Sequence, residues 1–302
     1  MLNESLRFER IEIIADLFCK LGFDKIVRFD LLEPEYVALK KIHGKNVEPE
    51  YLGLIALSAG AIDFQLGMGG AERFWSTLSI MADGFKDLNS LGHIKSLMKR
   101  FLNDPINARS QNIKRKRIRR IFGSSFAEWY LNSYESLRAN PMLLWRRLAK
   151  TIGSSMEKKT IVFSMKSFDI SHLVCYGDYV DFPWDIPIPV DFHVKRVTIS
   201  TGLLEYYGSD ELFRYVWSLV LRRVRERLGR KITLLRIDSI VWQIGKIMYA
   251  CKYKKENSQK SIEYYLTRKI GVEKTLANKM AIELTKFIEK IEHNKVKKRW
   301  RA

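Results

Sequence analysis

Residues 186–196 read IPIPVDFHVKR, and this stretch decides how the rest of the chain is interpreted. Pro187 and Pro189 each remove a backbone donor and favour an extended approach. Asp191 then stands directly before a run of helical character, where an aspartate commonly caps a helix N-terminus. A carboxylate held at such an end is also well placed for catalysis. Capping and catalysis are compatible, and the residues alone leave both interpretations open.

The sequence on either side predicts an all-α fold. Apolar residues recur at helical spacing along residues 8–21, and Gly22 follows as a helix stop. Pro49 marks the start of a helix that continues through the apolar run 51–66. No convincing series of alternating strands is present. The other long helical candidates are residues 209–228, 233–250 and 261–292.

The same pattern indicates how the chain is organised. We expect residues 1–302 to form one catalytic unit made of two helical lobes with an active-site cleft between them. Three prolines make residues 176–189 an extended connector between the lobes. One lobe would comprise about residues 50–175, and the other would comprise residues 1–49 together with 190–302.

The net charge of +19 is concentrated in two windows. Residues 101–150 hold 11 Lys and Arg against three Asp and Glu, and residues 251–302 hold 15 against six. Charge gathered in this way favours a polyanionic partner, although a solvated face that aids solubility would look the same. The sequence does not show which window contacts DNA, but residues 114–120 and the helices over 195–230 are the preferred segments. The candidates for phosphate contact are Lys114, Arg115, Lys116, Arg117, Lys195 and Arg196.

Several classes of protein are excluded. Cys19, Cys175 and Cys251 lie far apart without a CxxC pair, which argues against a cysteine-based zinc or iron–sulfur site. We therefore expect no metal and no cofactor. No apolar run approaches the roughly 20 residues needed to cross a bilayer, and no signal peptide opens the chain. The expectation is a monomeric cytoplasmic protein, associated with the nucleoid and without a membrane partner.

Two lysines lie upstream of the connector, in KKTIVFSMKSF at residues 158–168. Lys159 and Lys166 are seven apart, so on a helix they share a face, with Phe163 one turn from each. An amine beside an aromatic ring is partly desolvated, which favours the uncharged form that a nucleophile needs. The alternative is that both lysines extend from a buried helix to solvent. A lysine nucleophile with a carboxylate, in a cationic helical protein, suggests attack at a sugar carbon of DNA.

At this point the chain resembles a known family. PVDFHVKR at residues 189–196 is similar to the V-D-x-H-V-x-R signature of helix-hairpin-helix DNA glycosylases, whose aspartate is catalytic. In most of that superfamily the lysine lies closer to the aspartate, after a glycine-rich hairpin. Here Lys159 precedes Asp191 by 32 positions, and no glycine occurs between Ser154 and Tyr176. These features resemble the archaeal 8-oxoguanine DNA glycosylase (AGOG) family over nearly the whole chain, most clearly over residues 50–250.

The resemblance implies a role for each matching residue. Lys159 would be the Schiff-base lysine, with Lys166 as the alternative nucleophile, and Asp191 would be the catalytic aspartate. His193 and Arg196 would serve packing and phosphate contact rather than proton transfer. The residues implied to contact the flipped base are Phe163, Asp238, Trp242, Trp75 and, as the loosest match, Gln65. Without the resemblance, Trp75 would sooner be interpreted as a core tryptophan.

The activity implied by the resemblance is that of a bifunctional DNA glycosylase and AP lyase that excises 8-oxoguanine by base flipping. Lys159 would attack C1′ and β-elimination would follow. The substrate would be double-stranded DNA with a damaged guanine, and single-stranded DNA is a further possibility. Two alternatives stay open: a glycosylase of another lesion specificity, and a non-catalytic helical protein that binds nucleic acid.

Overall fold

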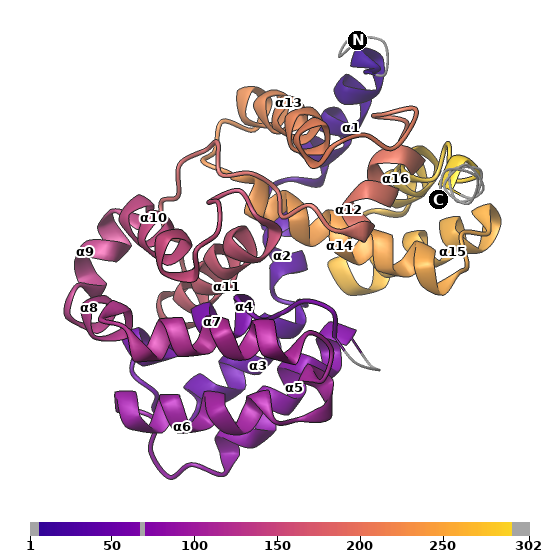
Figure 1. The fold of residues 1–302 in the computed structure, drawn as a ribbon. Helices are drawn as coiled ribbons and strands as arrows, with labels where there is room; N and C mark the ends of the chain where they lie inside the picture. The colour runs from indigo at the N-terminus through magenta and orange to yellow at the C-terminus, as the bar shows by residue number, and fades with distance from the viewer. Residues whose placement is uncertain (1–5, 67–69, 292–302) are drawn as a thin grey trace. The chain divides into compact units, whose positions relative to one another are not determined.

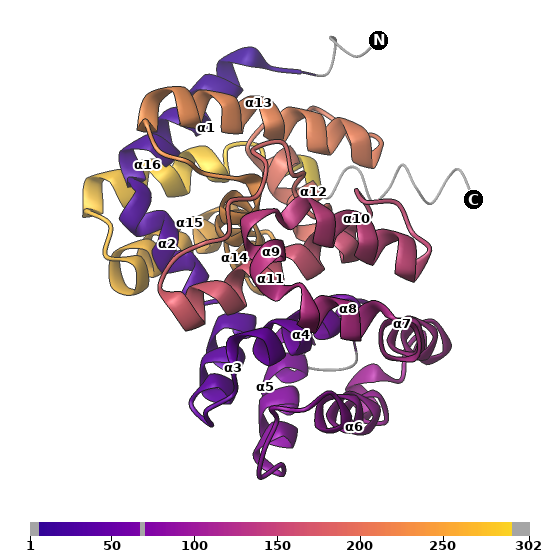
Figure 2. The same ribbon diagram turned by 90° about the vertical axis from the view of Figure 1, so that its left-hand side faces the viewer.

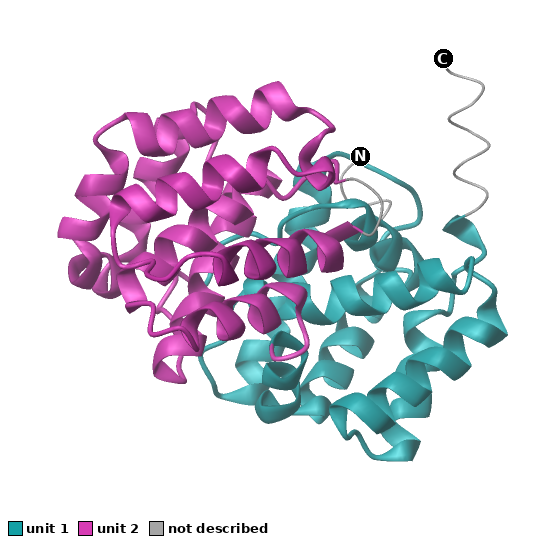
Figure 3. Ribbon diagram, turned by 90° about the horizontal axis from the view of Figure 1, so that it is seen from below, with its two compact units in different colours: residues 1–30, 184–302 teal, residues 31–183 magenta. Residues whose placement is uncertain are grey.

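The chain divides into two compact units, coloured separately in Figure 3. Unit 1 comprises residues 1–30 and 184–302, and unit 2 comprises residues 31–183. The computed structural model describes residues 6–66 and 70–291. Residues 31–49, which the sequence interpretation assigned to the same lobe as the C-terminal half, fall in unit 2.

Unit 2 is built from helices joined by short turns, labelled in Figure 1. A single 3₁₀ turn, Pro105–Asn107, interrupts the series of α-helices. The helices are α3 (Pro34–His43), α4 (Pro49–Gly60), α5 (Gly70–Asp83), α6 (Leu91–Leu102), α7 (Gln111–Gly123), α8 (Phe126–Asn132), α9 (Tyr134–Ala139), α10 (Pro141–Ile152) and α11 (Lys159–Tyr176).

Unit 1 combines two N-terminal helices with the C-terminal series. Its core joins apolar residues of both parts, among them Ile14, Phe18, Trp217 and Ile244. The helices are α1 (Phe8–Leu21), α2 (Phe23–Asp30), α12 (Phe192–Ser200), α13 (Asp210–Leu228), α14 (Leu234–Ala250), α15 (Lys255–Tyr265) and α16 (Lys274–Leu284), with a π-helical turn at Leu266–Ile270.

The all-α prediction is confirmed: residues 6–66 and 70–291 contain no β-strand, only an isolated bridge between Leu6 and Leu204. Two helix predictions were wrong in length. The helix from Pro49 ends at Gly60 rather than continuing to residue 66. The segment 261–292 is not one helix, because Gly271 adopts φ 75° and separates the π-helical turn from α16. A left-handed glycine ends a helix whatever apolar pattern continues beyond it. Residue 292, Gly67 and Gly69 lie outside the described residues.

The central element of unit 2 is α11, whose residues from Thr160 to Leu173 are buried apart from Phe163. A helix that is apolar on every side has to be enclosed by its neighbours. Helix α4 runs beside it (Figures 1 and 2) and approaches closely because α4 presents glycine at the crossing. A Cβ atom on Gly60 would lie 2.8 Å from the backbone Cα of Ser164. The contact therefore depends on the absence of a side chain at Gly60.

A buried ion pair ties α11 to the start of α3. Lys166 has no exposed surface, and its Nζ lies 3.0 Å from Oε2 of Glu33 and 3.8 Å from Oε1 of Glu35. Removing one member of such a pair typically costs about 3–5 kcal/mol, because the other charge stays buried. Burial raises the pKa of Glu35 well above its usual range, and the neighbouring Glu33 carboxylate raises it further. Lys166 and the two glutamate side chains thus form an enclosed cluster inside unit 2.

We predict that Gly60→Ala destabilises the protein by about 1–3 kcal/mol, because its methyl group overlaps the backbone of α11. Urea unfolding measures the change. Gly92→Ala is the matched control, since a Cβ atom there meets nothing within 4 Å on α6 and alanine favours a helix. Equal unfolding free energies for the two variants would contradict the close crossing.

We also predict an effect of pH on Glu35→Gln. The raised pKa means that the folded state favours the protonated carboxyl of Glu35. The stability that this carboxyl contributes is therefore fully present at pH values below its pKa in the unfolded state. That contribution is lost as pH rises through the folded pKa. Glutamine stays neutral, so the variant should gain stability relative to the wild type between about pH 5 and pH 8. Urea unfolding across that range, with the exposed Glu128→Gln as control, checks the sign. A constant difference between Glu35→Gln and the wild type would overturn the assignment.

Candidate active site

Lys159 and Asp191 both stand at the N-terminal ends of helices, and each belongs to a different unit. Lys159 is the first residue of α11 in unit 2 and is half-buried. Asp191 is the N-cap of α12 in unit 1 and is half-buried as well. A helix end at the edge of a packed core gives a side chain a fixed base and a route to a ligand.

The turn before Lys159 is held by contacts inside unit 2. Gly153 follows α10 with φ 68°, and a Cβ atom there would meet the Arg120 guanidinium at 2.6 Å. The same guanidinium donates a hydrogen bond to the carbonyl of Ile152. Farther along the turn, Nε1 of Trp145 donates to the carbonyl of Met156 at 2.9 Å. These bonds fix the path of the chain into the first turn of α11.

The two lysines of this helix occupy unlike places. Lys159 is at its half-buried end, and Phe163 is half-buried one turn farther on. Lys166 is wholly enclosed, bonded to Glu33, with its Nζ 5.8 Å from the Phe163 ring. An ammonium without exposed surface has no route to a sugar, so the geometry argues against Lys166 as the alternative nucleophile. Neither does Lys166 extend to solvent, the other possibility considered for both lysines.

The predicted cap at Asp191 is present. Its φ of −119° is extended, and the backbone N–H of Val194 donates to Oδ1 at 2.9 Å. The approach from the connector is anchored by Ile188 and Val190, which are buried in the core of unit 1. Apolar side chains and a cap bond together set the direction of the Asp191 carboxylate.

Helix α12 packs against α14, which carries Asp238 and Trp242. Gly245 permits this contact, because a Cβ atom there would lie 2.8 Å from Cβ of His193. The buried His193 ring meets the indole of Trp242 edge to face, with centroids 6.0 Å apart. Trp242 is half-buried, and Asp238, one turn before it, is 3% exposed. Unit 1 thus gathers a carboxylate cap, a tryptophan and a second carboxylate on two adjacent helices.

The two cations that follow Asp191 are already engaged. Nζ of Lys195 lies 2.5 Å from Oδ1 of Asp210, so a carboxylate neutralises it. The Arg196 guanidinium stacks over Phe192 at 4.1 Å and donates to the hydroxyl of Tyr253. Burial raises the pKa of Tyr253 to about 12. Packing therefore accounts for Arg196, and neither residue is presented as an open phosphate contact.

Trp75 was predicted to face a base, and the structure contradicts this prediction. The side chain has no exposed surface, and Nε1 donates to Oδ2 of Asp63 at 3.0 Å. It is a core tryptophan of unit 2, the interpretation that its sequence context alone favoured. Gln65 is exposed with φ 46° and shares a hydrogen bond with the Ser110 hydroxyl at the start of α7.

The basic run on α7 is less exposed than predicted. Lys114 is fully buried, so its assignment as a phosphate contact was wrong. Its Nζ donates to Oδ1 of Asn107 at 3.1 Å, and burial lowers the pKa of Lys114 to about 8. Arg117 is half-buried and donates to the carbonyl of Ala61 at 2.6 Å. Arg115 and Lys116 are exposed, as a phosphate contact requires. A helix packed on a core turns some of any dense basic run inwards.

Sequence reasoning missed the residues that support the site. A lysine inside the apolar run of α11 signals a buried cation, but nothing in the sequence identifies Glu33 as its partner. Gly245 carries no motif, although it sets the distance between α12 and α14. The stack of Arg196 on Phe192 and Tyr253 joins residues 57 positions apart, beyond the reach of any spacing rule.

Two structural features are absent from the described residues. The described residues contain no group of three or more His, Cys, Asp or Glu side chains able to bind a metal ion. Along residues 6–66 and 70–291, no helix combines the length and apolar character that crossing a bilayer would take.

Comparison with known proteins identifies the family. A family model described as AGOG, N-glycosylase/DNA lyase, matches residues 15–281. The N-glycosylase/DNA lyase of Pyrobaculum aerophilum is 24% identical over 245 residues, covering 78% of this chain and 86% of the relative. That of Nanoarchaeum equitans is 28% identical over 223 residues, covering 74% and 84%.

A solved structure shares the fold. The crystal structure of the 8-oxoguanosine complex of Pa-AGOG, an 8-oxoguanine DNA glycosylase from Pyrobaculum aerophilum, superposes with a TM-score of 0.64. It is 20% identical and covers 80% of this chain and 90% of its own. The expected resemblance is confirmed, and the enzymes named N-glycosylase/DNA lyase among the relatives argue against the alternative of a non-catalytic binding protein. The chain belongs to the AGOG family of N-glycosylase/DNA lyases.

Proposed function

We propose that this protein excises 8-oxoguanine from DNA and cleaves the strand at the resulting site, with Lys159 as nucleophile. The family supplies the reaction class, and Pa-AGOG, a relative with the same fold, is described as an 8-oxoguanine DNA glycosylase in complex with 8-oxoguanosine. One observation carries the choice of nucleophile: of the two candidate lysines, only Lys159 stands at an accessible helix start, while Lys166 is enclosed and ion-paired.

The proposed recognition step uses residues of both units. A base inside the duplex is inaccessible, so it must first leave the stack. Trp242 offers a half-buried indole for stacking, and Asp238 offers a carboxylate that accepts N–H groups of a guanine edge. Phe163, half-buried one turn from Lys159, offers a second apolar surface. Stacking on an aromatic ring contributes about 1–3 kcal/mol per base, comparable with the energy needed to unstack it.

The proposed chemistry proceeds by a covalent intermediate. The uncharged Nζ of Lys159 attacks C1′, and the C1′–N9 bond breaks, with its electron pair leaving on the base, which is protonated. The Asp191 carboxylate stabilises the positive charge that develops on the sugar. Ring opening gives an imine between Lys159 and C1′. Loss of a C2′ proton then breaks the C3′–O3′ bond, and water hydrolyses the imine to restore the amine.

The proposal extends to the partner: a monomer acting on double-stranded DNA, with single-stranded DNA as a second substrate form. Among the residues expected to contact phosphates, Arg115 and Lys116 are exposed and the rest are buried, stacked or paired.

We predict that Lys159→Ala abolishes borohydride trapping on a duplex with one 8-oxoguanine, because no imine can form. Lys166→Met combined with Glu33→Gln should retain the adduct, since this pair of changes removes both buried charges together. Gel electrophoresis after reduction measures the adduct. An adduct lost only in the double variant would reverse the assignment of the nucleophile. Trapping by the wild type on oxidised pyrimidines or alkylated purines, but not on 8-oxoguanine, would favour another specificity.

We predict that Asp191→Asn slows single-turnover excision about 10²–10³-fold, the typical loss when a charge-stabilising group is removed. Asparagine caps helices as well as aspartate does, so the Tm should change little. Asp191→Ala should show the same kinetic loss and, in addition, destabilise the protein by about 1 kcal/mol. Full activity in the asparagine variant would reduce Asp191 to a helix cap.

A further inference from the structure

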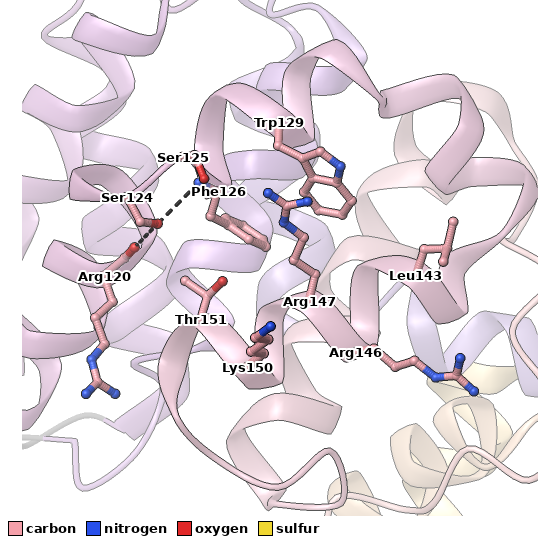
Figure 4. A pocket seen from close by; sticks show the side chains of 10 residues that line it. All are labelled: Arg120, Ser124, Ser125, Phe126, Trp129, Leu143, Arg146, Arg147, Lys150 and Thr151. Carbon is pink, nitrogen blue, oxygen red and sulfur yellow. Dashed lines mark hydrogen bonds between the residues drawn. The ribbon is translucent and has the colours of Figure 1, made fainter.

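Unit 2 contains a cavity of about 810 Å³ that is separate from Lys159 and lined by parts of α7, α8 and α10 (Figure 4). Its apolar surface comes from Phe126, Trp129 and Leu143. The charged residues that line it are all cations: Arg120, Arg146, Arg147 and Lys150. Arg147 and Lys150 lie at the centre of the view in Figure 4, with Arg120 and Arg146 at its two sides.

The charges of this cavity are not neutralised by carboxylates. Within residues 6–66 and 70–291, none of its four cations takes part in an ion pair. Other arginines and lysines of the protein are balanced by acids, for example Arg10, Lys195, Arg223 and Arg236. Like charges gathered without counterions repel one another, which favours binding of an anion there.

Two of the cations are nevertheless held in place. The Arg147 guanidinium lies 4.1 Å from the Trp129 ring centroid, a cation–π contact that positions the group and leaves its charge intact. The Arg120 guanidinium donates to the carbonyl of Ile152 and rests against Gly153. Neutral partners thus orient both side chains, so that binding an anion would require little reordering.

The shape and chemistry indicate which anion fits. The volume exceeds that of one phosphate group and lies within the usual range of small-molecule sites. A cationic centre beside aromatic and aliphatic surface matches a nucleotide unit, with its phosphate on the cations and its sugar or base on the apolar side. Lys150 and Thr151 belong to α10, the helix whose following turn leads to Lys159, so a strand bound here is held by the unit that carries the nucleophile.

We propose that this cavity is a second DNA-contact site, which binds a phosphodiester and its nucleotide away from the lesion. The inference rests on the proposed function for its ligand, a DNA strand. It assigns non-specific affinity to Arg147 and Lys150 of α10, beside Arg120 at the C-terminal end of the basic run of α7.

The test is the salt dependence of binding to an undamaged duplex, measured by fluorescence anisotropy. Arg147→Gln/Lys150→Gln should lower the slope of log K against log salt by about 1 for each phosphate that is no longer neutralised. At about 50 mM salt, the affinity should fall roughly tenfold for each such phosphate, because one counterion fewer is released. Lys95→Gln/Lys99→Gln removes the same charge from exposed positions of α6 in the same unit and should change the slope far less. Equal slopes in the two double variants would overturn the proposal.

A further measurement separates the remaining outcomes. Deoxyadenosine monophosphate, which offers a single nucleotide unit, should bind the wild type weakly by calorimetry and the Arg147→Gln/Lys150→Gln variant more weakly still. Tight nucleotide binding that the variant loses, with its DNA slope unchanged, would make the cavity a small-molecule site and overturn the proposal. The anisotropy measurement uses undamaged DNA. The salt dependence of binding can therefore be interpreted even if the protein does not excise 8-oxoguanine.

Discussion

The structure of unit 2 depends on the close approach of α4 to α11. The approach is possible because Gly60 has no side chain where the two helices cross, so the backbones meet at a distance that any Cβ atom would prevent. It encloses most of α11, and enclosure has an electrostatic consequence. Lys166, which has no exposed surface, needs a partner inside the protein, and Oε2 of Glu33 lies 3.0 Å from its Nζ. The same helix carries Lys159 at the end that the packing leaves accessible.

In unit 1 a glycine likewise permits a close contact between two helices, beside the other residue of the proposed site. Gly245 lets α12, which Asp191 caps, approach α14, and the His193 ring of α12 then meets the Trp242 ring of α14. In both units a helix end carries the reactive group, and a glycine-mediated contact fixes that helix. The side chains proposed to be catalytic are therefore positioned by helix packing one or more turns away from them.

The sequence predicted the helices whose signals are local. Gly22 and Gly229 end α1 and α13 where expected, and Ser209 caps α13 by accepting from Leu212 N–H. Predictions failed where tertiary packing determines the length of a helix or the burial of a side chain. The pattern of residues 261–292 looks continuous, yet Gly271 turns the chain. A basic run says nothing of which lysine points inwards, so Lys114 was misplaced. The roles of Lys159 and Asp191 came from a resemblance to a family, and the pairing of Lys166 with Glu33 joins residues 133 positions apart.

The fixed backbone position of Lys159 limits how far the amine proposed as nucleophile can move toward a sugar. Since α11 is enclosed along most of its length and its preceding turn is bonded to Arg120 and Trp145, the backbone at Lys159 has little freedom to adjust. All remaining adjustment belongs to the four methylene groups of the side chain. Such an arrangement raises the effective molarity of the amine at one point in space and makes it low elsewhere. With Lys159 as the proposed nucleophile, the nucleotide has to be brought to the amine, because the backbone that carries the amine cannot move far toward the nucleotide.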